Sequence, residues 1–383
     1  MNHRAALVAG SVVGLLGLSI AGLAVVGSVP AASATADGWS GWTGRVDTAS
    51  VSDKAAMTPD DDVAVALLQR SARAASTVAY SGRAVTWTRY GSSTTSITHV
   101  PGTGTISLPA GAPATEATLA PDGRSNSFAD DGRPLAVLRD NFRVLRQADL
   151  DTTVAGRPAD AVVAVDADGV LDARYWLDHA TGLLLRKELL DPKGLVYSRT
   201  GFETFSLGVP TGTVVPAAAQ DPWTERLTTA SLVTARTHGC ACPESLPGGL
   251  ALLDARRAPA GAVSSSPVVH QLFSDGLTTV SLFSIEGALG AEDAAGLAAR
   301  GFTRRQLGDH YAWVRGGTPQ VPTTTVVWAC HDYVLTLVAD NAIDPLRTAG
   351  AVVAAFPPVP DPQDSSLSAR VARGWHRITG GSS

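Results

Sequence analysis

The spacing of apolar and polar residues predicts a chain built mainly from antiparallel strands. Between residues 78 and 90, apolar and polar residues alternate with the period of a half-exposed strand. Val85 and Trp87 share one face of this predicted strand, and the small or polar residues beside them share the other. The stretch 96–108 continues as strand, turn and strand. The pattern therefore predicts an antiparallel meander near the start of the first half of the chain.

A second regular pattern, "YWLDHATGLLLRKELLDPKG", covers residues 175–194. The segments "HATG" and "DPKG" have the composition of tight turns, and the residues between them alternate in polarity. A further strand is expected over residues 195–207. Strands that follow one another through short turns pair antiparallel, so this region predicts a hairpin continued by a third strand.

Helical periodicity is confined to a few short segments. An amphipathic helix is expected after Asp60–Asp62, because acidic residues favour a helix N-terminus. After residue 240 the pattern alternates between hairpins, such as "VVHQLFSDGLTTVSLFSIEG", and helical segments, such as "AEDAAGLAARG". The fold class expected from these patterns is α+β, with two separate regions of alternation.

The composition shifts along the chain divide it into six segments. The apolar start, which ends in the small residues Ala32–Ser33–Ala34, is typical of a secretory signal peptide. Its uncharged run is also long enough for an uncleaved membrane anchor. Either reading places the rest of the chain outside the cytoplasm. The expected segments are a signal peptide or anchor (1–34), a linker (35–59), an N-terminal domain (60–208), a second linker (209–239), a C-terminal domain (240–357) and a flexible tail (358–383).

Charge and motifs argue for a binding protein instead of an enzyme. The formal net charge of −5 disfavours a nucleic-acid partner. The sequence contains no recognisable nucleophile elbow, P-loop, zinc-protease motif or dinucleotide-binding motif, so we expect no catalytic residues and no cofactor. Nitrogen and sulfur ligands occur near one another only in "HGCAC" and "ACH", whose spacing matches no zinc pattern, so no metal site is expected.

The chain has three cysteines, Cys240, Cys242 and Cys330. In an oxidising compartment a disulfide is expected, and one thiol is left over. A bridge within Cys240-Ala-Cys242 is expected to be too tight for the geometry that disulfides prefer. We therefore predict a Cys242–Cys330 bridge, which would close a loop across the C-terminal domain, with Cys240–Cys330 as the competing assignment.

The hairpin region resembles the RseB/MucB family of extracytoplasmic sigma-factor regulators. That family carries an aromatic-x-Asp-x-x-Thr/Ser-x-Leu-x-x-basic-x-x-Leu-x-Asp pattern followed by a glycine turn. "CPESLPGGLALLDARR" and "VHQLFSDGLTTVSLF" resemble its C-terminal domain. The matching hairpin positions are Trp176, Asp178, Thr181, Leu183, Arg186, Leu190, Asp191 and Gly194.

The resemblance implies a fold and a function. The N-terminal domain is expected to be an open half β-barrel with helices on its concave side, similar to lipoprotein carriers of the LolA type. A smaller C-terminal α+β domain is expected to bind the extracytoplasmic part of a membrane-bound anti-sigma factor. A lipid or lipoprotein is the expected ligand, in a groove that includes Val85 and Trp87. The implied function is negative regulation of sigma-factor signalling, and the alternative is a lipid or lipoprotein carrier with no regulatory role.

Overall fold

The computed structural model describes most of the chain between residues 61 and 356. Within that range the undescribed positions are 89, 121–132, 217–221, 224, 238–239, 241, 263, 308–309, 318–322 and 341–344. The predicted signal peptide or anchor, the linker 35–59 and the C-terminal tail lie outside the described residues. None of the described helices is sufficiently long and apolar to span a membrane.

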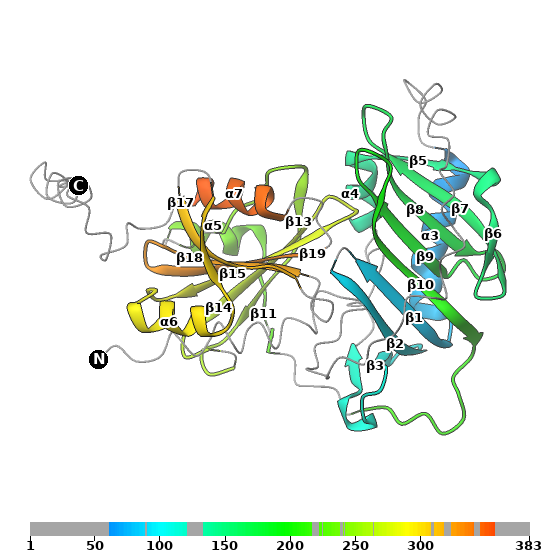
Figure 1. The fold of residues 1–383 in the computed structure, drawn as a ribbon, viewed down its shortest axis with the longest axis horizontal. Helices are drawn as coiled ribbons and strands as arrows, with labels where there is room; N and C mark the ends of the chain where they lie inside the picture. Colours follow the sequence, from blue (N-terminus) through cyan, green and yellow to red (C-terminus); the bar gives the residue numbers. More distant parts are fainter. Residues whose placement is uncertain are drawn as a thin grey trace, which may run out of the picture.

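Ten strands of the N-terminal half form one antiparallel sheet, called sheet A here (Figure 1). The strand order is β4-β3-β2-β1-β10-β9-β8-β7-β5, and β6 also pairs with β7. β1, the first strand of sheet A in the sequence, therefore pairs with β10, the last one in the sequence. The strands are β1 (Tyr80–Thr88), β2 (Gly91–Val100), β3 (Gly104–Pro109), β4 (Thr118–Ala120), β5 (Arg143–Arg146), β6 (Thr152–Val154), β7 (Arg157–Val165), β8 (Leu171–Asp178), β9 (Leu184–Leu190) and β10 (Val196–Leu207).

The predicted hairpin of residues 175–194 is confirmed as β8, β9 and the turn that leads into β10, and its turns explain its sequence. In the first turn, Asp178 accepts hydrogen bonds from the backbone N–H and the hydroxyl of Thr181, at 2.8 and 2.6 Å. In the second, the Asp191 carboxylate accepts from the N–H groups of Lys193 and Leu195, each at 2.9 Å. Each carboxylate thus satisfies turn donors locally, as Asx turns do.

Helices cover one face of sheet A. Helix α3 (Asp62–Thr77) begins where Asp61 accepts a hydrogen bond from the N–H of Val63 at 2.8 Å, so the predicted acidic start is confirmed. Helix α4 (Arg133–Asn141) lies beside it on the same core. The buried residues of this core come from both helices, from strands of sheet A and, in one case, Leu277, from the C-terminal half: Ala64, Leu68, Leu135, Leu138, Val144, Val162, Ala164, Ala173, Tyr175, Leu177, Leu189 and Leu277.

The C-terminal half forms a second antiparallel sheet, called sheet B here, with the order β11-β13-β14-β15-β19-β18-β17-β16 and with β12 pairing β13. Its strands are β11 (Glu225–Arg226), β12 (Ser245–Leu246), β13 (Leu250–Ala258), β14 (Val268–Ser274), β15 (Thr279–Glu286), β16 (Thr303–Leu307), β17 (His310–Arg315), β18 (Thr323–Cys330) and β19 (Tyr333–Asp340). Part of the predicted linker, including β11, is therefore a component of this sheet.

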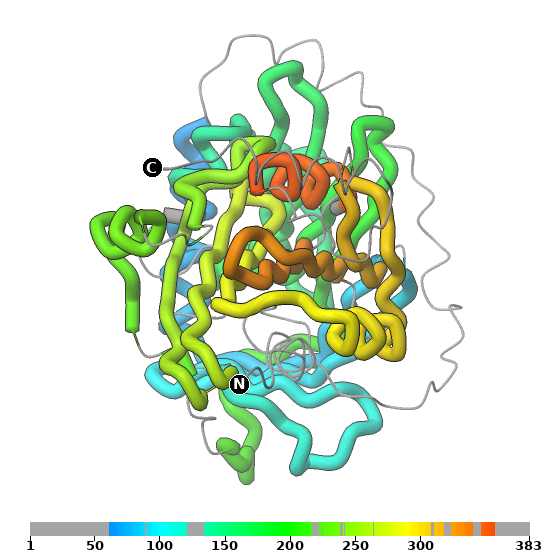
Figure 2. Tube along the Cα trace, turned by 90° about the vertical axis from the view of Figure 1, so that its left-hand side faces the viewer, coloured from blue at the N-terminus to red at the C-terminus, as the bar shows by residue number. Residues whose placement is uncertain are grey.

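Three helices accompany sheet B. Helix α7 (Pro345–Ala355) lies across the strands, as Figure 2 shows in red, and packs Val352 and Val353 into the largest core of the sheet. Helix α6 (Ala291–Ala299) packs Leu297 against Val327 and Val334, in a separate cluster. Helix α5 (Thr229–Thr237) buries Leu232 in a third cluster beside Cys240 and Cys242.

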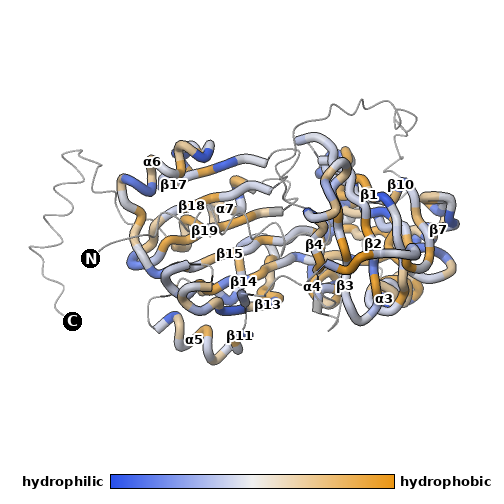
Figure 3. Tube along the Cα trace, turned by 90° about the horizontal axis from the view of Figure 1, so that it is seen from below, coloured by the Kyte–Doolittle hydropathy of each residue, from blue (hydrophilic) through white to orange (hydrophobic). Residues whose placement is uncertain are grey.

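Each sheet has its own hydrophobic clusters among the described residues. In Figure 1 the two sheets stand side by side, with α4 near the junction, and in Figure 3 hydrophobic segments run through both. Because β4 and β5 are the ends of sheet A, the sheet is open and not a closed barrel over its described residues. The α+β class predicted from the sequence is confirmed.

Candidate functional site

The first candidate site is the face of sheet A that carries Trp87. The backbone register places Trp87 opposite Arg199, Arg199 opposite Glu188, Glu188 opposite Arg174, and Arg174 opposite Val163. Residues in such a row share one face of a sheet. Val163 belongs to a different core from the one beneath α3 and α4. Trp87 therefore lies on the sheet face that these two helices leave uncovered.

Val85 shares this face with Trp87. Val85 lies opposite Gly201 on β10 and opposite Thr94 on β2. Trp87 is 44% exposed, and Val85 is partly buried. The two residues predicted to line a ligand groove are thus neighbours on one surface, outside the space between the helices and the sheet.

Beside Trp87 lies a group of four charged side chains, called the Glu188 cluster here. The Glu188 carboxylate is 1% exposed and receives hydrogen bonds from Arg199 Nε at 2.7 Å, Arg186 Nε at 3.0 Å and Arg174 Nη1 at 3.3 Å. The cluster therefore combines three positive charges with one negative charge. Burial lowers the pKa of Arg174, although Glu188 opposes this effect.

The Glu188 cluster is held in place by an aromatic ring. The Arg186 guanidinium lies 4.6 Å from the centre of the Trp176 ring, which is within the range of a cation–π interaction. Gly201 makes room for this arrangement, since a Cβ there would lie 3.2 Å from Arg186 Cγ. The surface thus presents an exposed indole next to fixed positive charge, which suits a ligand that has both an apolar part and an acidic part.

A second feature of sheet A was not predicted from the sequence. The Tyr80 ring contacts His99, Phe205 and Phe202 at centroid distances of 5.2, 5.7 and 6.0 Å. Gly82 on β1 lies opposite Phe205, and a Cβ there would meet Thr204 O at 2.2 Å and Phe202 Cδ1 at 2.8 Å. The only sequence signal for this cluster was the spacing of aromatic residues in two distant strands, which becomes meaningful once β1 is known to pair with β10.

The third feature is the junction between the two sheets. The turn between β14 and β15 inserts Leu277, which is 9% exposed, into the core beneath α3 and α4. Lys187 Nζ on β9 donates to Leu277 O at 3.0 Å. Asn141 Nδ2, at the end of α4, lies 3.2 Å from both Asp275 O and Gly249 O. The tip of one hairpin of sheet B therefore completes the helix-covered core of sheet A.

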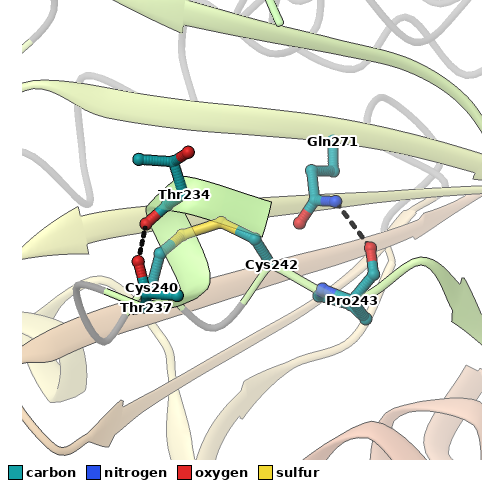
Figure 4. The surroundings of a disulfide bond; sticks show 6 residues. All are labelled: Thr234, Thr237, Cys240, Cys242, Pro243 and Gln271. Carbon is teal, nitrogen blue, oxygen red and sulfur yellow. Dashed lines mark hydrogen bonds between the residues drawn. A yellow bond between two sulfur atoms is a disulfide. The ribbon is translucent and has the colours of Figure 1, made fainter. Parts of the chain in front are cut away.

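The cysteines differ from the prediction. The structure joins Cys240 to Cys242 (Figure 4), and Cys330 is a free, buried thiol. The expected Cys242–Cys330 bridge is therefore wrong in this structure, and so is the competing Cys240–Cys330 assignment. The reason is local: the Cα atoms of Cys240 and Cys242 are 5.4 Å apart, a separation that a disulfide accepts. Cys330 instead packs in the core beneath α7.

Hydrogen bonds hold the backbone in place on both sides of the disulfide. Helix α5 precedes it, and Thr237 closes that helix by donating to Thr234 O at 2.7 Å. On its other side, Gln271 Nε2 donates to Pro243 O at 2.8 Å, which holds the segment against β14 (Figure 4). The disulfide thus fixes the point where the chain enters the main part of sheet B.

His270 is a buried titratable side chain of sheet B. His270 lies between Phe283 and Trp223, at centroid distances of 4.3 and 5.1 Å, and burial lowers its pKa to about 4. It is therefore neutral at physiological pH. No group of three His, Cys, Asp or Glu side chains among the described residues has the arrangement of a metal site.

Comparisons with known proteins give similarity only at the level of solved structures. No family model matches the chain, and no curated protein matches it. A crystal structure of MucB in complex with MucA(peri) is 21% identical, with 75% of this chain and 97% of that chain covered and a TM-score of 0.45. The complex structure of Pseudomonas aeruginosa MucA/MucB is 18% identical, with 76% of this chain and 97% of that chain covered and a TM-score of 0.42. A crystal structure of MucB is 20% identical, with 77% of this chain and 98% of that chain covered and a TM-score of 0.44. These identities and TM-scores are low, and neither the fold described above nor the function proposed below rests on them.

Proposed function

We propose that this chain is an extracytoplasmic negative regulator of sigma-factor signalling. It binds the extracytoplasmic domain of a membrane-bound anti-sigma factor and senses a lipid or lipoprotein. The observation that carries the proposal is the hairpin of β8, β9 and β10, whose sequence resembles the RseB/MucB family and whose Asp178 and Asp191 close the turns that the pattern requires. We propose no catalytic step for this chain.

A second sheet joined to the first supports regulation over simple transport. A carrier needs only a surface that holds its cargo, whereas a regulator needs a cargo surface and a partner surface that communicate. The insertion of Leu277 into the core of sheet A gives such a connection. In this proposal sheet B carries the partner surface and sheet A carries the ligand surface.

The ligand surface in the proposal is the face with Val85, Trp87 and the Glu188 cluster. An exposed indole offers apolar contact area, and the neighbouring arginines attract an acidic group. A lipid or lipidated peptide with an acidic headgroup combines both kinds of chemistry. This assignment extends the predicted groove residues to Arg199, which lies directly opposite Trp87.

The experiment has two arms on the full chain. In the first, calorimetry measures binding to the extracytoplasmic domain of the anti-sigma factor. In the second, the chain is titrated with vesicles of an acidic phospholipid and with vesicles of a neutral one. We expect binding in the first arm, a preference for acidic vesicles in the second, and weaker binding to both kinds of vesicle in Trp87→Ala.

The matched control for the vesicle arm is Tyr311→Ala, since Tyr311 is exposed to a similar extent, 48%, but lies on sheet B. Vesicle binding without any binding to the anti-sigma domain would favour the carrier alternative. Failure of both arms would refute the proposed function.

A further inference from the structure

Strand β16 forms an open edge of sheet B. It is the last strand in the sheet order and pairs only with β17 among the described strands. The four residues Thr303–Gln306 are exposed, and Leu307 alone is buried. An edge strand offers outward N–H and C=O groups to which another extended chain can add. The exposure of four successive residues indicates that this edge is accessible.

The edge is also positively charged. Arginine is the only charged residue type on β16 and β17 (Arg304, Arg305 and Arg315), and neither strand contains an acidic residue; Arg300 lies just before β16. The chain as a whole has a formal net charge of −5. The edge therefore has a local charge opposite to that of the molecule.

Two of these guanidinium groups are oriented by aromatic rings. The Arg304 guanidinium lies 4.7 Å from the centre of the Tyr311 ring, and that of Arg315 lies 4.9 Å from the Phe302 ring. Both distances are within the range of a cation–π interaction, which restricts each guanidinium to a position beside its ring. Arg304 lies on the edge strand itself, where a guanidinium can recognise a carboxylate through charge and hydrogen bonds.

The strand beneath them is rigid enough to act as a template. All five residues of β16 pair with β17, from Thr303 opposite Val314 to Leu307 opposite His310. Leu307 is buried in the core beneath α7. A partner strand would therefore meet a fixed backbone.

We infer that the β16 edge binds an extended acidic segment of a partner protein, which adds a strand to sheet B. Charge selects this occupant: the arginines repel the same edge of a second copy of this chain and attract a strand rich in Asp or Glu. The inference rests on the proposed function in one respect, since the partner it names is the extracytoplasmic domain of the anti-sigma factor.

The test compares two double variants of the full chain. Arg304→Glu/Arg305→Glu reverses the charge of the β16 edge. The matched control, Arg226→Glu/Arg257→Glu, makes the same change of charge at the opposite edge of the same sheet, on β11 and β13, where the two side chains are 64% and 47% exposed. A milder variant, Arg304→Gln/Arg305→Gln, covers the case in which charge reversal disturbs folding.

Two probes are used: a synthetic peptide of alternating Glu and Val, and the anti-sigma domain. A peptide with Lys in place of Glu serves as the negative probe. We expect the acidic peptide to protect from hydrogen exchange those backbone amides of β16 that point away from β17, and to bind about tenfold more weakly to the Glu variant, with about twofold or less change in the control. The affinity of the Gln variant for the acidic peptide should lie between the affinities of the Glu variant and the control.

The outcomes separate the two claims. Equal binding of the acidic peptide to wild type and to the Arg304 and Arg305 variants, or protection at β11 instead of β16, overturns the inference. If the anti-sigma domain binds all forms equally, the proposed function stands and the β16 assignment fails. If the acidic peptide binds at β16 but the anti-sigma domain binds no form, the acidic-strand site stands and the proposed function, with the partner named here, fails.

Discussion

Gly276 lies at the tip of the hairpin that joins sheet B to sheet A, and replacing it with alanine tests whether that junction stabilises the molecule. Its φ is +99°, a conformation that residues with a side chain rarely adopt. A Cβ at this position would lie 2.4 Å from the Cα of Leu138 and 2.8 Å from its backbone nitrogen. These are backbone atoms of α4, so the turn must move away from the helix.

The size of the effect follows from what the turn contributes. Moving it away exposes Leu277, whose burial is worth roughly 2 kcal/mol. It also breaks the hydrogen bonds from Lys187 to Leu277 and from Asn141 to Asp275, worth about 1 kcal/mol each. We expect Gly276→Ala to lower the free energy of unfolding by roughly 3–5 kcal/mol, which includes partial relaxation and the backbone strain.

The control is Gly301→Ala, at the end of α6. Gly301 also has a positive φ, +81°, but nothing lies within 4 Å of an added Cβ, so its cost should be only the backbone strain of about 1–2 kcal/mol. Urea unfolding monitored by tryptophan fluorescence gives both values, and hydrogen exchange reports whether α4 opens. If both variants lose the same free energy of unfolding and the amides of α4 stay protected from hydrogen exchange, the hairpin tip does not couple the two sheets.

Three further predictions concern single groups. Burial, and to a lesser extent the repulsion of two other carboxylates, raises the pKa of Asp172 from 3.8 to about 7. Between these two pH values the folded state keeps a proton that the unfolded state releases, so the free energy of unfolding falls as the pH rises from 3.8 to about 7. Asp172→Asn should remove that fall in urea unfolding at several pH values; an unchanged slope contradicts it. Cys330 is 3% exposed and burial raises its pKa, so iodoacetamide should modify it only after unfolding and the other two cysteines only after reduction; a Cys330-linked peptide in non-reduced digests contradicts the structure. Gly82→Ala should cost about 2 kcal/mol through its overlap with Thr204, whereas Gly316→Ala, with open space around it, should be neutral; equal stabilities would contradict the packing of β1 on β10.

The elements that the sequence predicted best are those held by local chemistry. The turns at Asp178 and Asp191 form from carboxylates that bond N–H groups within four residues, and the start of α3 depends on Asp61 and the residue two positions later. Alternation along β1 also placed Val85 and Trp87 on a common face, which the register bears out. Signals of this kind lie within a few neighbouring residues, and a sequence pattern contains them.

The remaining features depend on contacts between distant segments. Nothing near Leu277 indicates that its side chain belongs to the core of sheet A, because "SDG" followed by an apolar residue is typical of any hairpin tip. The cysteine assignment failed because it depended on how far the chain extends across one residue, a distance of 5.4 Å that the sequence does not specify. The Glu188 cluster was missed because its arginines come from three strands whose order is a property of the whole sheet.

The pairing of β1 with β10 has a consequence for how the protein reaches its native state. Tyr80 lies opposite Leu207, so the strand of sheet A that is synthesised first pairs with the one that is synthesised last. Contacts between positions so far apart in the chain make folding slow, since a long loop must close before they form. Until residues 196–207 have been synthesised, the side of β1 that pairs with β10 has no partner strand within sheet A. Sheet A can therefore be completed only after its last strand has left the ribosome.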